Sequence, residues 1–218
     1  MGHVIEQFIS QFQQQSGLEA IAVVLALAYV WLAARQSIWC WPCAFIGTSI
    51  YTYIFWEVSL PFHMLLNGYY IFMAVYGWWQ WRQGNEYDDT NIQLSIKDKT
   101  KPISKKSLKF HGFFAVILTA VSLAWGWFMA NYTDAAFPYL DTFTTVFAVF
   151  ATYLVAERIL ENWLYWIVID FVSIYLYVEK ALLPTAFLFL LFVVIACFGY
   201  FKWHKIYLTN TGEQVRVG

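Results

Sequence analysis

Long apolar stretches alternate with short polar ones along almost the whole chain. A transmembrane helix needs about 20 mostly apolar residues, and seven stretches come close to that length. They run over Leu18–Ala34, Ile38–Trp56, Leu60–Trp81, Phe110–Ala130, Pro138–Ala156, Trp163–Val178 and Leu182–Trp203. The pattern therefore predicts an all-α integral membrane protein with seven transmembrane helices. The longest polar interval, 83–109, separates the third stretch from the fourth and holds most of the lysines.

Three short motifs of the first three predicted helices recur in the last three. The pairs are Leu32-Ala33-Ala34-Arg35 with Val155-Ala156-Glu157-Arg158, Pro61 with Pro184, and Tyr76-Gly77-Trp78-Trp79-Gln80-Trp81-Arg82 with Phe198-Gly199-Tyr200-Phe201-Lys202-Trp203-His204. Their offsets are 123, 123 and 122 residues. Three matches in order at a nearly constant offset predict an internal repeat.

A repeat of three helices would leave its second copy upside down unless one more helix intervened. The fourth predicted helix restores the orientation, so we expect a 3+1+3 arrangement with parallel repeats, as in SWEET-type carriers. The whole chain, 1–218, then forms a single membrane domain. Its parts are a first repeat (17–82), a basic cytoplasmic loop (83–109), a linking helix (110–130), a second repeat (138–204) and a cytoplasmic tail (205–218).

Composition agrees with a membrane location. Hydrophobic residues make up 61% of the chain and charged residues 12%, whereas soluble domains carry about 25% charged residues. The net charge of −1 is uninformative about nucleic acid, but the chain has no phosphate-binding glycine loop or long basic stripe, so no nucleic-acid partner is expected. The chain has no HExxH, GxSxG or Walker motif, so neither an enzyme nor a bound metal or cofactor is expected. The CWPC sequence at Cys40–Cys43 lies within an apolar segment, where a packing role is favoured over a redox role.

Basic residues predict the orientation. With the 83–109 loop inside, twelve of the thirteen lysines and arginines fall on the cytoplasmic side, and only Lys180 falls outside. We therefore expect the N-terminus outside and the C-terminus in the cytoplasm. The first sixteen residues contain no lysine or arginine, unlike the start of a signal peptide, so the first apolar segment is expected to stay in the mature protein.

Asp170 is the clearest candidate for a binding residue, because an ionisable group inside a span is costly and is usually functional. Trp163 and Trp166 precede it at spacings of seven and four residues, so all three share one helical face. Two indoles and a carboxylate on one face could hold a flat organic cation. The alternatives are that Trp163 lies at the membrane interface and that Asp170 bonds a neighbouring helix.

The third predicted helix offers a second group of polar candidates. Asn67 is its deepest amide and has Tyr70 one turn away, and an amide can donate and accept hydrogen bonds at once. An interhelical hydrogen bond would explain Asn67 equally well. Thr48, in the second helix, is as consistent with packing as with substrate contact. The aromatic run Tyr76–Trp81 is explained by anchoring at the membrane interface.

Two motifs resemble the PnuC family of bacterial vitamin transporters. They are Glu161-Asn162-Trp163-x-x-Trp166-x-x-x-Asp170 and Tyr76-Gly77-Trp78. The resemblance extends over nearly the whole chain. It implies a uniporter in the bacterial inner membrane, assembled as a homotrimer, that takes up a vitamin by facilitated diffusion. It also adds Asn162 to the candidate binding residues. Members of the family carry nicotinamide riboside, thiamine, riboflavin or deoxynucleosides.

Two positions depart from the pattern of the riboside carriers in that family. Asp170 stands where that pattern has Asn, and Asn67 stands where it has Gln. The carboxamide of nicotinamide needs both a hydrogen-bond acceptor and a donor, whereas an ionised carboxylate only accepts. Thiamine combines an aminopyrimidine with a cationic thiazolium, which suits a carboxylate beside two indoles. We therefore expect thiamine, with nicotinamide riboside as the alternative. A receptor that binds a vitamin without transporting it is the rival class.

Overall fold

The computed structural model describes residues 10–11, 17–57, 61–82 and 101–217. Seven long helices fill most of this part of the chain, and its only β-pairing is an isolated parallel bridge between Ser104 and Ile159. The helices are α2 (Gly17–Ala34), α3 (Cys40–Glu57), α4 (Pro61–Arg82), α5 (Leu108–Tyr132), α6 (Pro138–Ala156), α7 (Asn162–Glu179) and α8 (Leu183–Val217). The all-α fold and the number of helices agree with the sequence.

Four of these helices are long and apolar enough to cross a membrane by length and composition: α2, α5, α6 and most of α8. The other three, α3, α4 and α7, have suitable lengths of 18, 22 and 18 residues. They are rich in tryptophan and tyrosine, whose amphipathic rings score low on hydropathy scales although they favour membrane interfaces. The four apolar helices are candidates for membrane-spanning segments.

The chain divides into two compact units, each built from separate stretches. The first unit comprises residues 1–15, 105–151 and 161–197, and the second comprises residues 16–104, 152–160 and 198–218. The first unit therefore holds α5, α7 and most of α6, whereas the second holds α2, α3 and α4.

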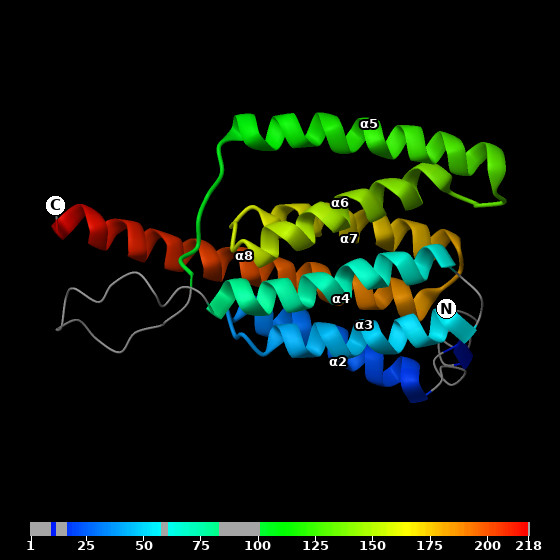
Figure 1. Cartoon of the computed structure of the whole chain (residues 1–218), viewed down its shortest axis with the longest axis horizontal. Helices are drawn as coiled ribbons and strands as arrows, with labels where there is room; N and C mark the ends of the chain where they lie inside the picture. The colour runs from blue at the N-terminus through cyan, green and yellow to red at the C-terminus, as the bar shows by residue number, and fades with distance from the viewer. Residues whose placement is uncertain (1–9, 12–16, 58–60, 83–100, 218) are drawn as a thin grey trace, which may run out of the picture. The chain divides into compact units, whose positions relative to one another are not determined.

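In the second unit, α3 packs against both α2 and α4, and Figure 1 shows the three helices side by side. A glycine allows the approach of α3 to α4. A Cβ atom added at Gly77 would lie 2.2 Å from Cζ2 of Trp41, a distance that no larger residue could accept without a shift. The edge of the Trp41 indole therefore occupies the space that a side chain at position 77 would need.

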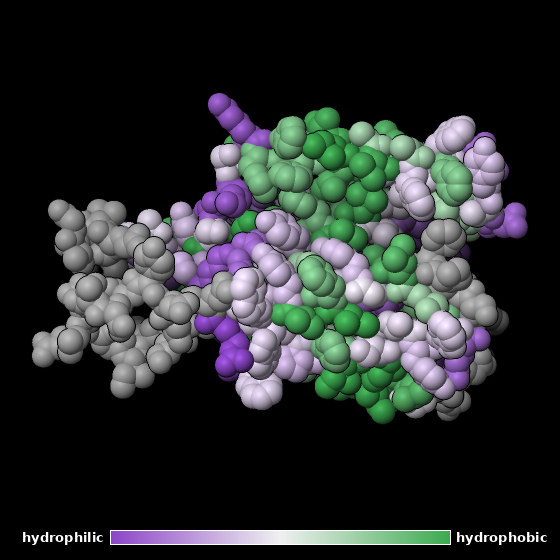
Figure 2. Space-filling view, viewed as in Figure 1, coloured by the Kyte–Doolittle hydropathy of each residue, from purple (hydrophilic) through white to green (hydrophobic). Residues whose placement is uncertain are grey.

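In the first unit, α6 and α7 share an apolar core. Phe147, Ala148 and Ala151 of α6 and Ile169 of α7 are buried together. The long helix α5 exposes large hydrophobic side chains along its length, among them Val116, Leu123 and Trp127. Figure 2 shows mostly hydrophobic residues over the α5 surface. Such a surface is stable where lipid, rather than water, solvates it.

The helix ends support the internal repeat and define its register. α2 and α6 end at Ala34 and Ala156, and α3 and α7 span Cys40–Glu57 and Asn162–Glu179, so both pairs differ by 122 residues. Gln36 and Arg158, also 122 apart, both have positive φ, 59° and 55°. In each case the N–H of the next residue donates to the carbonyl five residues back, which closes a Schellman cap. In the sequence, Leu32–Arg35 was matched to Val155–Arg158 at an offset of 123 residues. The equivalent caps pair Gln36 with Arg158 instead, at an offset of 122 residues.

Two sequence expectations need comment. The tail after Trp203 is helical, because α8 continues to Val217. Hydropathy marks where an apolar stretch ends, and a helix can continue beyond that point into polar sequence. The basic loop was expected at 83–109, and its part 83–100 lies outside the described residues.

Candidate functional site

Helix α7 carries the predicted stripe of two tryptophans and a carboxylate. The helix begins at Asn162, and its apolar residues Ile169 and Leu176 are buried along with Trp163 and Asp170. Residues seven apart lie on nearly the same side of a helix, so Trp163 and Asp170 share the buried side of α7. The common face predicted from spacing is therefore present.

The two tryptophans lie in different surroundings. Trp163 is 2% exposed, which excludes the alternative that it lies in lipid at the membrane interface. Trp166 is half-buried and packs against the apolar core of the first unit, formed by Phe147, Ala148, Ala151 and Ile169. One side of Trp166 is therefore engaged in packing, so a substrate could use only the remainder of its ring.

Asp170 is the most unusual residue of this face. It is 2% exposed, and Asp170 and Arg158 are the buried charged residues of the described chain. Among the described residues, no hydrogen bond or ion pair to the Asp170 carboxylate is present. Burial of a carboxylate without compensation costs several kcal/mol. Asp170 is therefore suited to bind a positively charged group that arrives from outside the chain.

The other predicted residues are distributed over both units. Asn162 is fully buried at the start of α7 in the first unit. Asn67 is buried in α4, and Tyr70 is half-buried and forms an edge contact with Tyr69, with ring centroids 5.6 Å apart. The Thr48 hydroxyl donates a 2.5 Å hydrogen bond to the carbonyl of Ala44 in its own helix. The Thr48 hydroxyl donates within its own helix, and its oxygen can still accept a hydrogen bond.

A polar cluster that the sequence did not reveal anchors the start of α7. The Tyr165 hydroxyl lies 3.0 Å from Nδ1 of His111, which belongs to α5. Nε2 of the same histidine lies 3.7 Å from a carboxylate oxygen of Glu161. The Glu161 carboxylate also accepts a 3.4 Å hydrogen bond from the backbone N–H of Lys106. These contacts connect the start of α5 with the start of α7, through residues before and after Trp163 in the sequence.

A second unpredicted cluster surrounds Glu157, just after α6 in the second unit. Lys101 forms a 2.6 Å ion pair with this carboxylate, Gln80 donates a 2.9 Å hydrogen bond, and the Tyr76 hydroxyl donates another. Burial alone would raise the pKa of Glu157, but the bonds from Lys101, Tyr76 and Gln80 outweigh it and hold the pKa below its usual value. Tyr76 therefore has a specific polar contact in addition to its place in the aromatic run.

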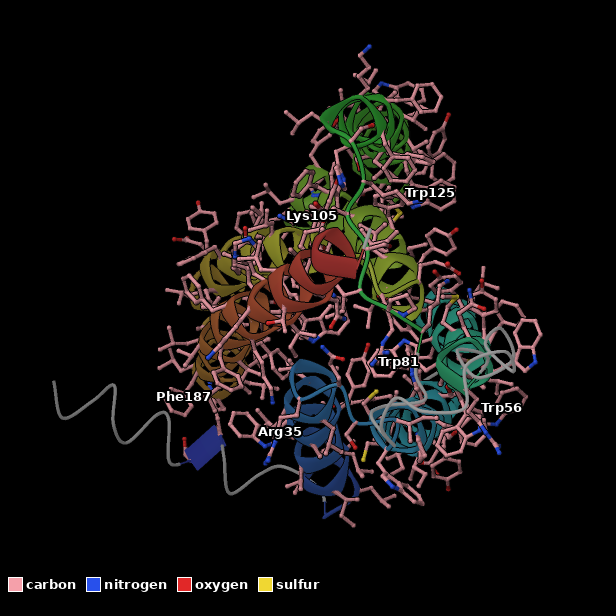
Figure 3. The ribbon with its side chains drawn as sticks, turned by 90° about the vertical axis from the view of Figure 1, so that its left-hand side faces the viewer. Arg35, Trp56, Trp81, Lys105, Trp125 and Phe187 are labelled. Atoms are coloured by element: carbon pink, nitrogen blue, oxygen red, sulfur yellow. The ribbon has the colours of Figure 1, made fainter. Side chains whose placement is uncertain are left out.

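The interfacial explanation of the Tyr76–Trp81 run is wrong for Trp81. Its side chain is fully buried, and its indole N–H donates a 3.2 Å hydrogen bond to the Val155 carbonyl. Figure 3 shows Trp81 directed inward among the helices of the second unit, whereas Trp56, which is 69% exposed, lies at the outer edge. A buried indole needs such a bond partner, which sequence position alone could not disclose.

Several helices long and apolar enough to cross a membrane, together with a buried carboxylate in one of the helices, are typical of membrane transporters. Residues 16–205 match the family described as nicotinamide mononucleotide transporter. The chain belongs to this family, the PnuC family of transporters.

Individual relatives share this similarity over most of their length. The nicotinamide riboside transporter PnuC of Neisseria mucosa is 24% identical over 96% of this chain and 80% of its own. PnuC of Escherichia coli is 20% identical over 86% of this chain and 85% of its own. The riboflavin/roseoflavin transporter RibM of Streptomyces davaonensis is 22% identical over 91% and 89%.

A solved structure shares the fold. The crystal structure of the vitamin B3 transporter PnuC superposes with a TM-score of 0.69, covering 94% of this chain and 89% of the other at 20% identity. The similarity confirms the helical fold.

Proposed function

We propose that the protein is a uniporter that takes up a cationic aromatic vitamin and binds its positive charge at Asp170. The observation that carries the proposal is the burial of this carboxylate without a hydrogen bond or ion pair among the described residues. A cation placed against it would offset the cost of burial, because a carboxylate taken out of water is stable only when paired. Trp163 would contribute aromatic surface beside the charge.

Thiamine is the first candidate within this class. Its thiazolium is a permanent cation, and its amino group can donate to a carboxylate, which only accepts hydrogen bonds. Nicotinamide riboside is the second candidate. It is also a cation, and relatives from Neisseria mucosa and Escherichia coli are named for it. No relative described above is named for thiamine, so the chemistry of Asp170 alone favours it. Riboflavin, for which the Streptomyces relative is named, is neutral and gains nothing from the carboxylate.

Transport would proceed by alternating access between two parallel three-helix repeats joined by α5. The common register of 122 residues supports this 3+1+3 arrangement. Substrate sites of such carriers lie near the middle of the membrane, between the repeats, so Asn162, Asn67, Tyr70 and Thr48 stay candidates for further contacts. A homotrimer, the bacterial inner membrane, an external N-terminus and a cytoplasmic C-terminus complete the proposal.

Isothermal titration of the purified protein in nanodiscs tests the substrate class. Thiamine, nicotinamide riboside and riboflavin would be titrated in turn, with the neutral riboflavin as the charge control. We expect thiamine to bind most tightly and riboflavin most weakly. Tight binding of nicotinamide riboside without binding of thiamine would replace the first candidate by the second. Preferential binding of riboflavin would refute the role of charge at Asp170.

A further inference from the structure

Two tryptophans of the second unit make hydrogen bonds that mirror each other. The indole N–H of Trp81, at the end of α4, donates to the Val155 carbonyl at 3.2 Å. The indole N–H of Trp203, in α8, donates to the Ala33 carbonyl at 3.1 Å. Trp81 and Trp203 are 122 residues apart, and so are Ala33 and Val155. Each half of the sequence thus donates the same bond to the other half.

Equivalent residues of the two halves also contact each other. The rings of Trp81 and Trp203 lie with their centroids 6.1 Å apart. Gln36 and Arg158, the equivalent cap residues of α2 and α6, are joined by a 3.1 Å hydrogen bond from Nη2 to Oε1. Both pairs therefore bring equivalent residues of the two halves of the sequence together at one end of the second unit.

Three of these side chains are shielded from solvent. Trp81 and Trp203 have no exposed surface, and Arg158 is 1% exposed. The Arg158 guanidinium lies over the Trp81 ring, 4.4 Å from its centroid, and donates to the Lys101 carbonyl as well as to Gln36. A cation over an indole face is attractive, more so when both are shielded from water.

The segment before α5 covers the same end. The Ser104 N–H donates to the Arg158 carbonyl at 3.1 Å, and the Leu160 N–H donates to the Ser104 carbonyl at 2.9 Å. Lys101 adds the 2.6 Å ion pair with Glu157. The backbone on both sides of Arg158 is therefore fixed, which holds its side chain over Trp81.

We propose that Trp81, Trp203 and Arg158 form a plug at this end of the second unit that must separate for a substrate to pass. The inference rests on the proposed function to the extent that a carrier must open each end in turn. The plug lies where α2 and α6 end, which is the cytoplasmic side in the orientation that the basic residues predict. It would thus control release of the vitamin into the cell.

Cys40 provides a native reporter of the plug. Its thiol is fully buried at the start of α3, and the adjacent Trp41 packs edge-on against Trp81, with ring centroids 5.4 Å apart. The rate at which a maleimide modifies Cys40 would be measured in nanodiscs, with Cys43 and Cys197 replaced by alanine. Nanodiscs expose both faces, so the measurement does not depend on orientation, and it needs neither substrate nor transport.

The test compares Trp81→Phe/Trp203→Phe with the unmodified plug. Phenylalanine keeps an aromatic ring but removes both indole donors, and the loss of two neutral hydrogen bonds should speed modification of Cys40 roughly tenfold or more. Trp56→Phe, at a position 69% exposed in α3, is the matched control and should leave the rate unchanged. An unchanged rate in the double variant, with or without a loss of thermal stability, would overturn the plug.

A cross-link provides a second test that does not depend on the stability of the tryptophan variants. Gln36→Cys and Arg158→Cys, in a background without the three native cysteines, would be joined by a short bis-maleimide. We expect the joined protein to bind the vitamin but to lose transport, whereas omission of the linker leaves transport measurable. Full transport by the joined protein would overturn the plug. A failure of vitamin binding before joining would instead count against the proposed function and leave the Cys40 result standing.

Discussion

Replacement of Asp170 by asparagine separates the two consequences of a buried carboxylate. The change keeps the size and shape of the side chain and removes its charge. In the protein without substrate it removes an uncompensated charge from a site that is 2% exposed. The melting temperature of the empty protein should therefore stay the same or rise, because the cost of burying the carboxylate disappears.

The affinity for the vitamin should change in the opposite direction. Two unit charges about 4 Å apart attract by about 4 kcal/mol at an effective dielectric constant of about 20. Part of this energy is lost when the vitamin and the carboxylate give up water. The net value should approach that of a charged hydrogen bond, about 1.5–3 kcal/mol. Asp170→Asn should thus raise the Kd for thiamine about 10- to 100-fold.

Isothermal titration and thermal unfolding in the same detergent or nanodisc would measure both quantities. Asp141→Asn is the matched control, since Asp141 is a partly exposed carboxylate at the start of α6 in a 2.9 Å ion pair with Lys180. It should leave the Kd unchanged, because a partly exposed ion pair contributes little and Asp141 pairs with Lys180 at the end of α7, ten residues after Asp170. An unchanged Kd in Asp170→Asn would refute the assignment of Asp170 to the binding site.

Two further predictions concern the second unit. Gly77→Ala would place a Cβ atom 2.2 Å from the Trp41 ring and should lower stability by about 1–3 kcal/mol. Gly68→Ala, in the same helix, is the control, because a Cβ atom there meets nothing within 4 Å and should be neutral or stabilising. Equal melting temperatures of the two variants would contradict the packing of Trp41 against Gly77. The second prediction concerns Glu157, whose pKa is lowered in the folded protein. Its ion pair with Lys101 should therefore stabilise the folded protein fully above the usual glutamate pKa of about 4.3. This stabilisation should be lost as the pH falls through the lower pKa of the folded state. The difference in melting temperature between the parent and Glu157→Gln should be constant above about pH 5 and shrink as the pH falls below about 4.3. A difference that stays constant below that pH would count against the contact.

The sequence predicted the fold well where one physical property dominates. The cost of exposing backbone to lipid forces helices, so apolar stretches identify helices such as α2 and α5 directly. The extension of α8 to Val217 could not be predicted in this way, because no apolar pattern marks a helix that continues into polar sequence. The sequence matches predicted a repeat, and only the equivalent caps at Gln36 and Arg158 point to an offset of 122 residues.

The candidate site was predicted in part, through the cost of a charge in a membrane. That cost identified Asp170, and the helical period placed Trp163 on the same face. The packing of Trp166 against α6 depends on tertiary contacts that spacing does not contain. The role of Trp81 was missed because an aromatic residue near a helix end looks the same in sequence whether it faces lipid or a carbonyl of another helix. Its match to Trp203 in the repeat was the signal that could have indicated its burial.

Uptake by proteoliposomes containing only this protein tests the central claim most directly. Labelled thiamine would be supplied outside, with and without an imposed proton gradient, and vesicles containing Asp170→Asn would serve as the control. The account predicts saturable uptake that stops when the internal and external concentrations are equal, that a proton gradient does not alter, and that falls in the Asp170→Asn vesicles at low thiamine concentration. Accumulation above the external concentration under a gradient, or no uptake of any cationic vitamin, would contradict it.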